Sequence, residues 1–359
     1  MRPVHFLGVF IPIAVGLELA HAAPTLVFLT AALGVVPTAA VMGEATEHLA
    51  AKTGPGVGGL LNVTFGNAPE LIIAFFALQK GLQEVVKASI VGSIVGNVLL
   101  VLGAAMLAGG LKRDKQVFNR TAASAQSGML LLAVAAMVMP AVFQLVHGGG
   151  LPTVGDERVN FGSDLEKLSF GTAIILMAGY VAGLFFSLKT HREVFNPYED
   201  SGDDEGGWSM KRSLVTLGIA AVLVGVMSEV LVGSISAASK DIGLSQFFVG
   251  VFVVAIVGNA AEHWVAVAVA VKDKMDLAVG IAIGSSAQVA LFVAPILVLL
   301  SFVVGPNPMA LVFNGYEIGG LLFAVLVANF LTQDGESNWF EGVQLLSLYA
   351  VLGLVFFFA

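Results

Sequence analysis

The chain contains no cysteine and few charged residues, and both absences restrict what it can be. Without cysteine there is no disulfide, no thiolate metal site and no redox chemistry at sulfur. Only 12% of the 359 residues are charged, whereas soluble domains carry about a quarter. The net charge is -8, and no cluster of lysine and arginine forms a basic patch. The composition therefore argues against a nucleic-acid-binding protein and against an ordinary soluble domain.

Hydrophobic residues make up 57% of the chain and form long uninterrupted stretches. About 20 apolar residues suffice for a helix to cross a bilayer, so the sequence predicts an all-α polytopic membrane protein. The first stretch contains Glu18 and lacks a clear cleavage site of small residues, so we interpret it as a retained helix and not as a signal peptide. The eleven predicted transmembrane helices cover 4–22, 25–50, 57–79, 85–110, 122–146, 166–188, 213–237, 244–271, 276–304, 308–331 and 338–359.

The basic residues of the connections predict an orientation. Cytoplasmic loops are enriched in lysine and arginine, and twelve of the 17 basic residues fall on the side that holds the N-terminus. We therefore expect a cytoplasmic N-terminus and an external C-terminus. The external side then carries only Lys80, Lys87, Arg158, Lys167 and Lys240.

The polar connection 189–212 separates two halves and has an acidic centre. On its charge alone it is most simply a solvated loop; the alternative is a surface that gathers divalent cations near a pore mouth. The predicted domains are an N-terminal helix at 1–23, a five-helix repeat at 24–188, this linker at 189–212 and a second five-helix repeat at 213–359. The acidic residues of the linker are Glu199, Asp200, Asp203, Asp204 and Glu205.

An internal repeat relates the two halves. A shift of 192 residues places the motif GNAPE at 66–70 on GNAAE at 258–262, and Gly92-Ser93 on Gly284-Ser285. The two GNA motifs lie in predicted helices three and eight, which run in opposite directions through the membrane. Repeats of inverted topology are typical of secondary transporters, which bind their substrate near the bilayer midplane where the repeats meet.

Each motif carries a glutamate in an apolar stretch, Glu70 in the first and Glu262 in the second. A carboxylate at the membrane centre costs about 2.5 kcal/mol or more, so such residues are functional candidates. Glycine and asparagine are poor helix formers and Pro69 lacks an N–H group, so we expect local unwinding at both motifs. Asn67 shares a helical face with Glu70, and Asn259 shares one with Glu262.

Predicted helices four and nine add neutral oxygen atoms to the two carboxylates. Such a ligand set suits Ca²⁺, which takes about 6–8 oxygen ligands, and burial with mutual repulsion favours protonated carboxyls where no cation is bound. Ca²⁺ and protons would therefore compete for one site. The alternative, a structural pair with a buried lysine or arginine, lacks a basic residue in mid-helix. The supporting residues are Ser93, Asn97, Ser285, Ser286 and Gln288.

Three further residues have weaker assignments. His263 follows Glu262 directly but aligns with Leu71 in the repeat, so a hydrogen-bonded structural histidine and a proton relay stay equally open. Glu44 and Glu229 occupy corresponding places in predicted helices two and seven, and we expect them to line an access path or gate.

The motifs resemble those of the calcium/proton exchangers, within the cation/calcium exchanger superfamily. The similarity rests on GNAPE followed by GSIVGN at 92–97, and on GNAAEH at 258–263 followed by GSSAQ at 284–288. MGEATE at 42–47 and DGESNW at 334–339 are also similar. The resemblance implies eleven helices, inverted repeats, an acidic linker, and cation and proton exchange at Glu70 and Glu262. It also implies supporting roles for the polar residues named above and a sliding of helices two and seven.

We therefore expect a secondary antiporter, not an enzyme, that exports calcium in exchange for protons and needs no cofactor. A sodium-coupled exchanger on the same scaffold is the alternative, and a cation channel a more remote one. In the sodium/calcium exchangers the residues before the acid are serine or threonine, so the asparagine version favours protons. The short N-terminal segment favours a prokaryotic cytoplasmic membrane. The oligomeric state is left open, a homo-oligomer included.

Overall fold

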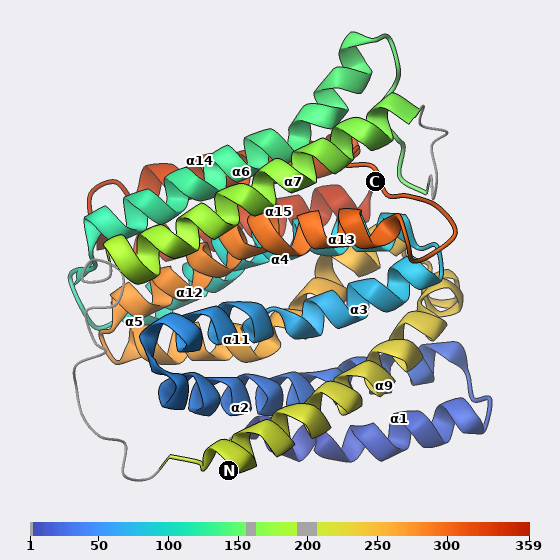
Figure 1. The fold of residues 1–359 in the computed structure, drawn as a ribbon, viewed down its shortest axis with the longest axis horizontal. Coiled ribbons are helices and arrows are strands. Elements are labelled where there is room, and N and C mark those ends of the chain that lie inside the picture. The colour runs from blue at the N-terminus through green and yellow to red at the C-terminus, as the bar shows by residue number, and fades with distance from the viewer. Residues whose placement is uncertain (1–2, 156–162, 192–206) are drawn as a thin grey trace. The chain divides into compact units, whose positions relative to one another are not determined.

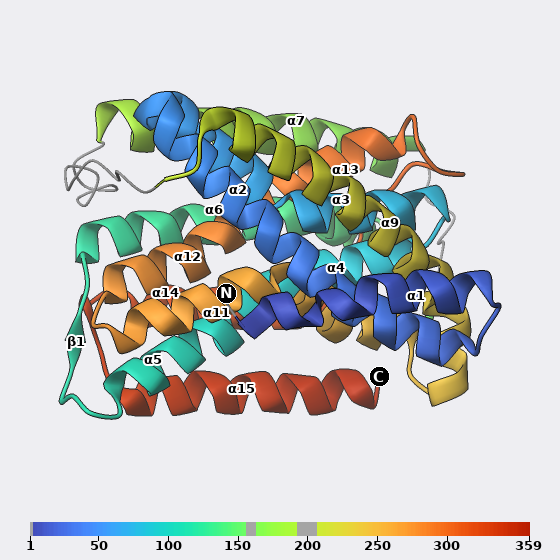
Figure 2. The ribbon, with the colours of Figure 1, turned by 90° about the horizontal axis from the view of Figure 1, so that it is seen from below.

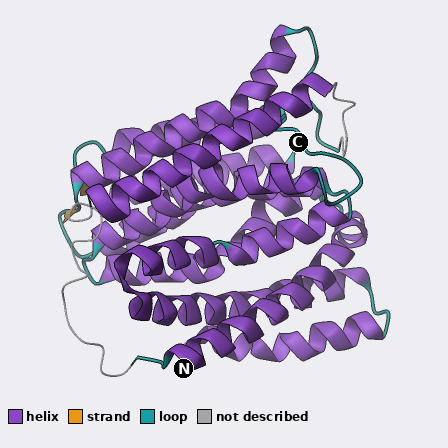
Figure 3. Cartoon of the chain, in the orientation of Figure 1, coloured by secondary structure: helices purple, strands orange, loops and turns teal. Residues whose placement is uncertain are grey.

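The computed structural model describes residues 3–155, 163–191 and 207–359. These residues form helices joined by short connections, with one pair of two-residue strands (Figure 3). Eight helices are long and apolar enough to cross a membrane, which confirms a polytopic helical membrane protein; the number eleven stays a prediction. The acidic residues predicted in the linker, Glu199, Asp200, Asp203, Asp204 and Glu205, lie outside the described residues.

The chain divides into two compact units. Unit 1 comprises 1–76, 180–242 and 257–261, and unit 2 comprises 77–179, 243–256 and 262–359. Each unit draws on both halves of the sequence, so this division differs in kind from the predicted repeats, whose boundaries stay predictions.

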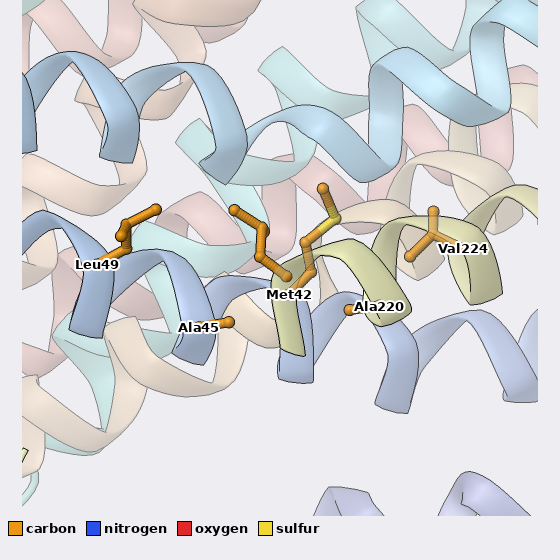
Figure 4. Close-up of a cluster of buried hydrophobic side chains, with 6 residues drawn as sticks. Met42, Ala45, Leu49, Ala220 and Val224 are labelled. Atoms are coloured by element: carbon orange, nitrogen blue, oxygen red, sulfur yellow. The ribbon is translucent and has the colours of Figure 1, made fainter. Parts of the chain in front are cut away.

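In unit 1 a long helix packs along a second one. Apolar residues of α2 and α9 meet in a core made of Met42, Ala45 and Leu49 from α2 and Leu217, Ala220 and Val224 from α9 (Figure 4). The two alanines let the helices approach closely, as small residues do between membrane helices. The unit contains η1 (Pro3–Val9, a 3-10 helix), α1 (Phe10–Leu19), α2 (Pro24–Gly66), most of α3 (Ala68–Gln79) and α9 (Met210–Ile242).

The helical backbone of α2 continues through residues 51–56, where the sequence predicted a connection. The span suited to a membrane is its first part, Pro24–Thr53. The prediction took glycine, proline and lysine as signs that the helix ends. Glycine disfavours a helix by only about 1 kcal/mol and proline by about 3 kcal/mol, and tertiary packing overrides such preferences. The break in the helix comes later, at Asn67.

Unit 2 holds the remaining helices, of which α6 packs against α12 and α14 (Figure 1) and α15 packs against α5 (Figure 2). Its α-helices are α4 (Gln83–Val95), α5 (Leu102–Gly110), α6 (Arg120–Val146), α7 (Ser163–Phe185), α10 (Gln246–Phe248), α11 (Ala255–Val271), α12 (Met275–Gln288), α13 (Ala294–Ser301), α14 (Gly315–Leu331) and α15 (Trp339–Phe357). Short π-helical segments interrupt them: η2 (Gly96–Val101), η3 (Phe186–Thr190), η4 (Val249–Val254) and η5 (Val289–Val293). By residue number, the C-terminal part of α7, with η3, and residues 257–261 of α11 belong to unit 1.

Two of the π-helical segments occupy matching places in the sequence repeat. A shift of 192 residues moves the range of η2 onto 288–293, which overlaps η5. Each segment follows a helix that carries the Gly-Ser pair, α4 in one case and α12 in the other. π-helical turns are rare and often occur at functional sites, so this shared irregularity supports the repeat that the sequence predicted.

A glycine allows α4 to cross η4 in direct backbone contact. A Cβ at Gly92 would stand 2.1 Å from the carbonyl oxygen of Val251, which no side chain tolerates. From the other side, a Cβ at Gly250 would meet Cβ of Ala88 at 2.7 Å. Glycine is therefore required at both position 92 and position 250 for the two helices to cross at this distance.

The strands β1 (Gln116–Val117) and β2 (Glu336–Ser337) pair in antiparallel register, which the all-α prediction did not include. Lys115 Nζ lies 2.6 Å from Glu336 Oε1, and both side chains are about half exposed. Gln116 is buried and donates to Ala270 O and to Asp273 Oδ1. The motif at 334–339 therefore ties the connection before α6 to the one before α15.

The orientation argument counted Lys87 among the external basic residues, although the predicted helix 85–110 already contains it. Lys87 lies within α4, is 6% exposed, and donates a hydrogen bond of 2.9 Å to the carbonyl oxygen of Val312. Lys87 therefore does not count among the basic residues of the external connections.

Candidate ion-binding carboxylates

The first glutamate stands directly behind a break between two helices. α2 ends at Gly66, Asn67 leaves the helical conformation, and α3 begins at Ala68 with Glu70 in its first turn. Carboxylates are stabilised near a helix N-terminus, where backbone N–H groups have no partner within the helix. The predicted unwinding is confirmed here, and Pro69 contributes to it because it cannot donate to the preceding turn.

The second motif does not unwind, so the prediction was wrong there. α11 runs without interruption from Ala255 to Val271 through Gly258 and Asn259. Ala261 replaces the proline of the first copy, and its N–H group can complete the helical hydrogen bonding. The irregular backbone precedes the motif instead, in η4.

Within unit 1 the glycine of the second motif packs against the glutamate of the first. A Cβ at Gly258 would stand 3.2 Å from Cγ and 3.6 Å from Cδ of Glu70. Asn67 and Asn259 are also buried in this unit, at 1% and 0% exposure. The fold thus brings Gly258 and Glu70, from motifs 192 positions apart, into contact.

Within unit 2 the second glutamate receives a short hydrogen bond. Ser285 Oγ on α12 donates to Glu262 Oε2 on α11 over 2.6 Å. This length is typical of a hydroxyl that donates to an ionised carboxylate, which is among the stronger hydrogen bonds in proteins. The predicted association of Ser285 with Glu262 is therefore present as a direct contact.

His263 and Asn97 meet in the same unit. His263 Nε2 donates to Asn97 Oδ1 over 3.2 Å, since an amide oxygen can only accept. Asn97 is 1% exposed, and its Nδ2 has no hydrogen-bond partner among the described residues. The contact joins α11 to η2, and it gives His263 a positioning partner from the other half of the sequence. Whether the histidine relays protons stays a prediction.

The remaining predicted ligands have mixed surroundings. Ser93 is buried on α4, and Gln288 is partly buried at the end of α12. Ser286 Oγ donates to Ala282 O of its own helix over 2.8 Å and lies 3.5 Å from Ile94 O on α4. The two adjacent serines therefore differ: Ser285 reaches the carboxylate, whereas Ser286 bonds to backbone.

The predicted gating residues lie on the two helices that form the core of unit 1. Glu44 is partly buried on α2, and Glu229 is exposed on α9. Nearby, His48 stacks on Trp208 with ring centroids 4.8 Å apart. The access role of Glu44 and Glu229 stays a prediction.

Sequence reasoning missed a buried group of charges in unit 2. Glu84 and Lys87 on α4 and Glu317 on α14 are 5%, 6% and 1% exposed. Two sequence patterns could have indicated this group: Glu84 and Lys87 are three residues apart, and Asn314-x-x-Glu317 is a helix-capping motif. They were overlooked because Lys87 was counted among the basic residues of the connections and Glu317 was given no role.

The structure contains apolar helices that can span a bilayer, and its apolar helices carry buried asparagines and partly buried glutamates. This combination defines a polytopic membrane protein that handles polar solutes or ions. Comparison with known proteins then identifies the family. A model of the family described as sodium/calcium exchanger protein matches residues 23–189 and 212–358. The chain belongs to the sodium/calcium exchanger family, which consists of transporters and not of enzymes.

Similar proteins cover the chain almost completely. A Ca²⁺/H⁺ antiporter of Aphanothece halophytica is 43% identical over 97% of this chain and 94% of its own length. The Ca²⁺/H⁺ antiporter ChaA of Bacillus subtilis is 42% identical over 97% of this chain and 96% of its own. A crystal structure of the Ca²⁺/H⁺ antiporter protein YfkE superposes with a TM-score of 0.83 at 38% identity and covers both chains fully.

Proposed function

We propose that this protein is a secondary antiporter that exchanges calcium for protons. The observation that carries the proposal is the whole-length similarity to proteins named Ca²⁺/H⁺ antiporters, at 43% and 42% identity. The same names favour protons over sodium as the counter-ion, in agreement with asparagine before each acid. Calcium and protons are then the substrates, and no cofactor is required.

In the proposed mechanism Glu70 and Glu262 hold either Ca²⁺ or protons. Ca²⁺ stabilises both ionised carboxylates, whereas a buried carboxyl without a cation favours its protonated form. Ser285 supports the ionised form of Glu262 through its 2.6 Å hydrogen bond. Its hydroxyl oxygen also has lone pairs that can face a cation. Asn67, Asn259, Ser93, Asn97, Ser286 and Gln288 supply further neutral oxygens in this proposal.

The proposed architecture is an N-terminal helix followed by two inverted repeats of five helices, with the N-terminus in the cytoplasm of a prokaryote and the C-terminus outside. Inversion provides two related states open to opposite sides, and alternating access follows from exchange between them. The overlap of η2 and η5 under the 192-residue shift supports the repeat. Glu44 and Glu229 are proposed to line the access path.

The test is calcium flux in proteoliposomes that contain the purified protein. An imposed pH gradient should drive uptake of Ca²⁺ against its concentration gradient, and a sodium gradient of the same size should not. Glu70→Gln and Glu262→Gln should each abolish the pH-driven flux. Glu336→Gln is the control, because Glu336 is exposed and paired with Lys115. Full pH-driven flux in either site variant would overturn the mechanism, and flux driven by sodium alone would favour the sodium-coupled exchanger.

A further inference from the structure

Unit 2 contains a second set of buried charges that is separate from Glu70 and Glu262. It is made of Glu84, Lys87 and Glu317, and we name it the α4–α14 charge cluster. All three side chains are at most 6% exposed. Burial of an unpaired charge costs several kcal/mol or more, so a cluster of this kind has to balance its charges.

Glu84 and Lys87 balance each other by their positions. They lie three residues apart on α4 and therefore share one face of the helix, with about 5–6 Å between their Cβ atoms. Glu84 Oε1 also accepts a hydrogen bond of 2.7 Å from the backbone N–H of Gly155. Lys87 donates to Val312 O. These hydrogen bonds and the nearby opposite charge favour the ionised form of each group.

Glu317 is left with half of its carboxyl group unsatisfied. Oε2 accepts the N–H of Asn314 over 2.7 Å in a capping box. Oε1 is buried and has no hydrogen-bond partner among the described residues. An ionised carboxylate would leave a buried negative charge on this oxygen without a donor, whereas a protonated carboxyl is neutral.

Within residues 3–155, 163–191 and 207–359, the surroundings of Glu317 supply one positive charge, that of Lys87. Among the described residues, Lys87 and Glu84 of α4 are the charged groups that act on Glu317, and α6, η2 and α15, which also pack against α14, add none. One lysine cannot neutralise two buried carboxylates. With all three groups ionised, the cluster would carry one uncompensated negative charge.

We propose that the α4–α14 charge cluster is a proton-binding site, in which Glu317 holds a proton at neutral pH and keeps it while calcium is exchanged elsewhere. Lys87 and Glu84 are the charged pair beside it. The proton neutralises the remaining charge and lets α14 begin in the buried interior of unit 2. This proposal does not depend on the exchange mechanism.

Infrared difference spectroscopy of the purified protein at neutral pH tests the proton directly. Glu317→Gln should remove a band of a protonated carboxyl group and leave the carboxylate bands unchanged. Glu336→Gln is the matched control: it should remove carboxylate intensity only, because Glu336 is exposed and paired with Lys115. Loss of carboxylate intensity in Glu317→Gln would overturn the proposal. So would disappearance of the wild-type acid band of Glu317 on addition of Ca²⁺.

Charge-balanced double variants provide a second measurement through the melting temperature. Lys87→Met should lower it, because Glu84 is then left uncompensated. Adding Glu84→Gln should restore at least half of the loss, whereas adding Glu317→Gln should restore none, since that carboxyl is already neutral. If Glu317→Gln restores the melting temperature instead, or if neither change does, the assignment of the proton to Glu317 is contradicted. If Lys87→Met does not fold, the infrared result on Glu317→Gln decides alone.

Discussion

Gly258 lies so close to Glu70 that a Cβ at this position would stand 3.2 Å from Cγ of the glutamate. The contact connects the two copies of the sequence motif within unit 1. It also explains why a glycine precedes Asn259 in an otherwise regular helix: the absence of a side chain leaves room for the carboxylate of the other copy.

Gly258→Ala should therefore lower the pH-driven calcium flux. The added methyl group forces Glu70 to move by a few tenths of an ångström, and misplacement of a reacting group by about 1 Å costs about a hundredfold. We expect a reduction of about tenfold, measured in proteoliposomes at equal protein content. Gly280→Ala is the control, because a Cβ there meets nothing within 4 Å. Equal flux in both variants would show that the contact with Glu70 is unimportant.

Ser285→Ala should weaken the binding of Ca²⁺ relative to protons. The serine hydroxyl supports the ionised form of Glu262, and a hydrogen bond to a charged group contributes about 1.5–3 kcal/mol. At neutral pH the Ca²⁺ concentration for half-maximal flux should rise about tenfold. The difference from wild type should shrink as the pH is raised, because protons then compete less.

Ser285→Thr keeps the hydroxyl and should retain most of the wild-type affinity. A constant difference between Ser285→Ala and wild type at every pH would argue that the serine binds calcium but does not act through the protonation of Glu262.

Gly92→Ala should destabilise the fold. Its Cβ would stand 2.1 Å from the carbonyl oxygen of Val251, so α4 and η4 would have to separate. Overpacking of this kind costs about 1–3 kcal/mol, occasionally more, and should appear as a lower melting temperature in detergent. Gly96→Ala, one turn further along the chain, has an open environment and should be neutral or stabilising. A similar melting temperature for both variants would disprove the close crossing.

Gln116→Ala should cost more stability than Lys115→Ala, although the lysine forms the ion pair. Gln116 is 1% exposed and donates to Ala270 O and Asp273 Oδ1. Its removal deletes both hydrogen bonds, each of which contributes about 0.5–1.5 kcal/mol. The ion pair of Lys115 with Glu336 is about half exposed, and exposed pairs contribute about 0–1 kcal/mol. Thermal unfolding of both variants measures the difference, and the reverse order would show that the ion pair holds β1 and β2 together.

Much of the membrane character and of the candidate site was predictable from the sequence. Long apolar stretches exclude a soluble domain, because only helices or closed barrels satisfy the backbone in lipid. Glutamates within such stretches are costly and therefore stand out. A repeat spaced by 192 residues is visible because its matching positions are glycine, asparagine and glutamate, not the interchangeable apolar residues.

Other features were decided only by tertiary packing. The same Gly-Asn pair breaks the chain at Asn67 but not at Asn259, because local preferences of about 1 kcal/mol yield to proline and to neighbouring helices. Neighbours in sequence also diverge in space: Ser285 bonds to Glu262, and Ser286 bonds to the backbone. Lys87 and Glu317 are 230 residues apart in sequence and come close enough to interact electrostatically only in the folded chain. From sequence alone, the apolar stretches singled out Glu70 and Glu262 but not Lys87 and Glu317. The burial and the partners of charged residues depend on long-range contacts that no local pattern records.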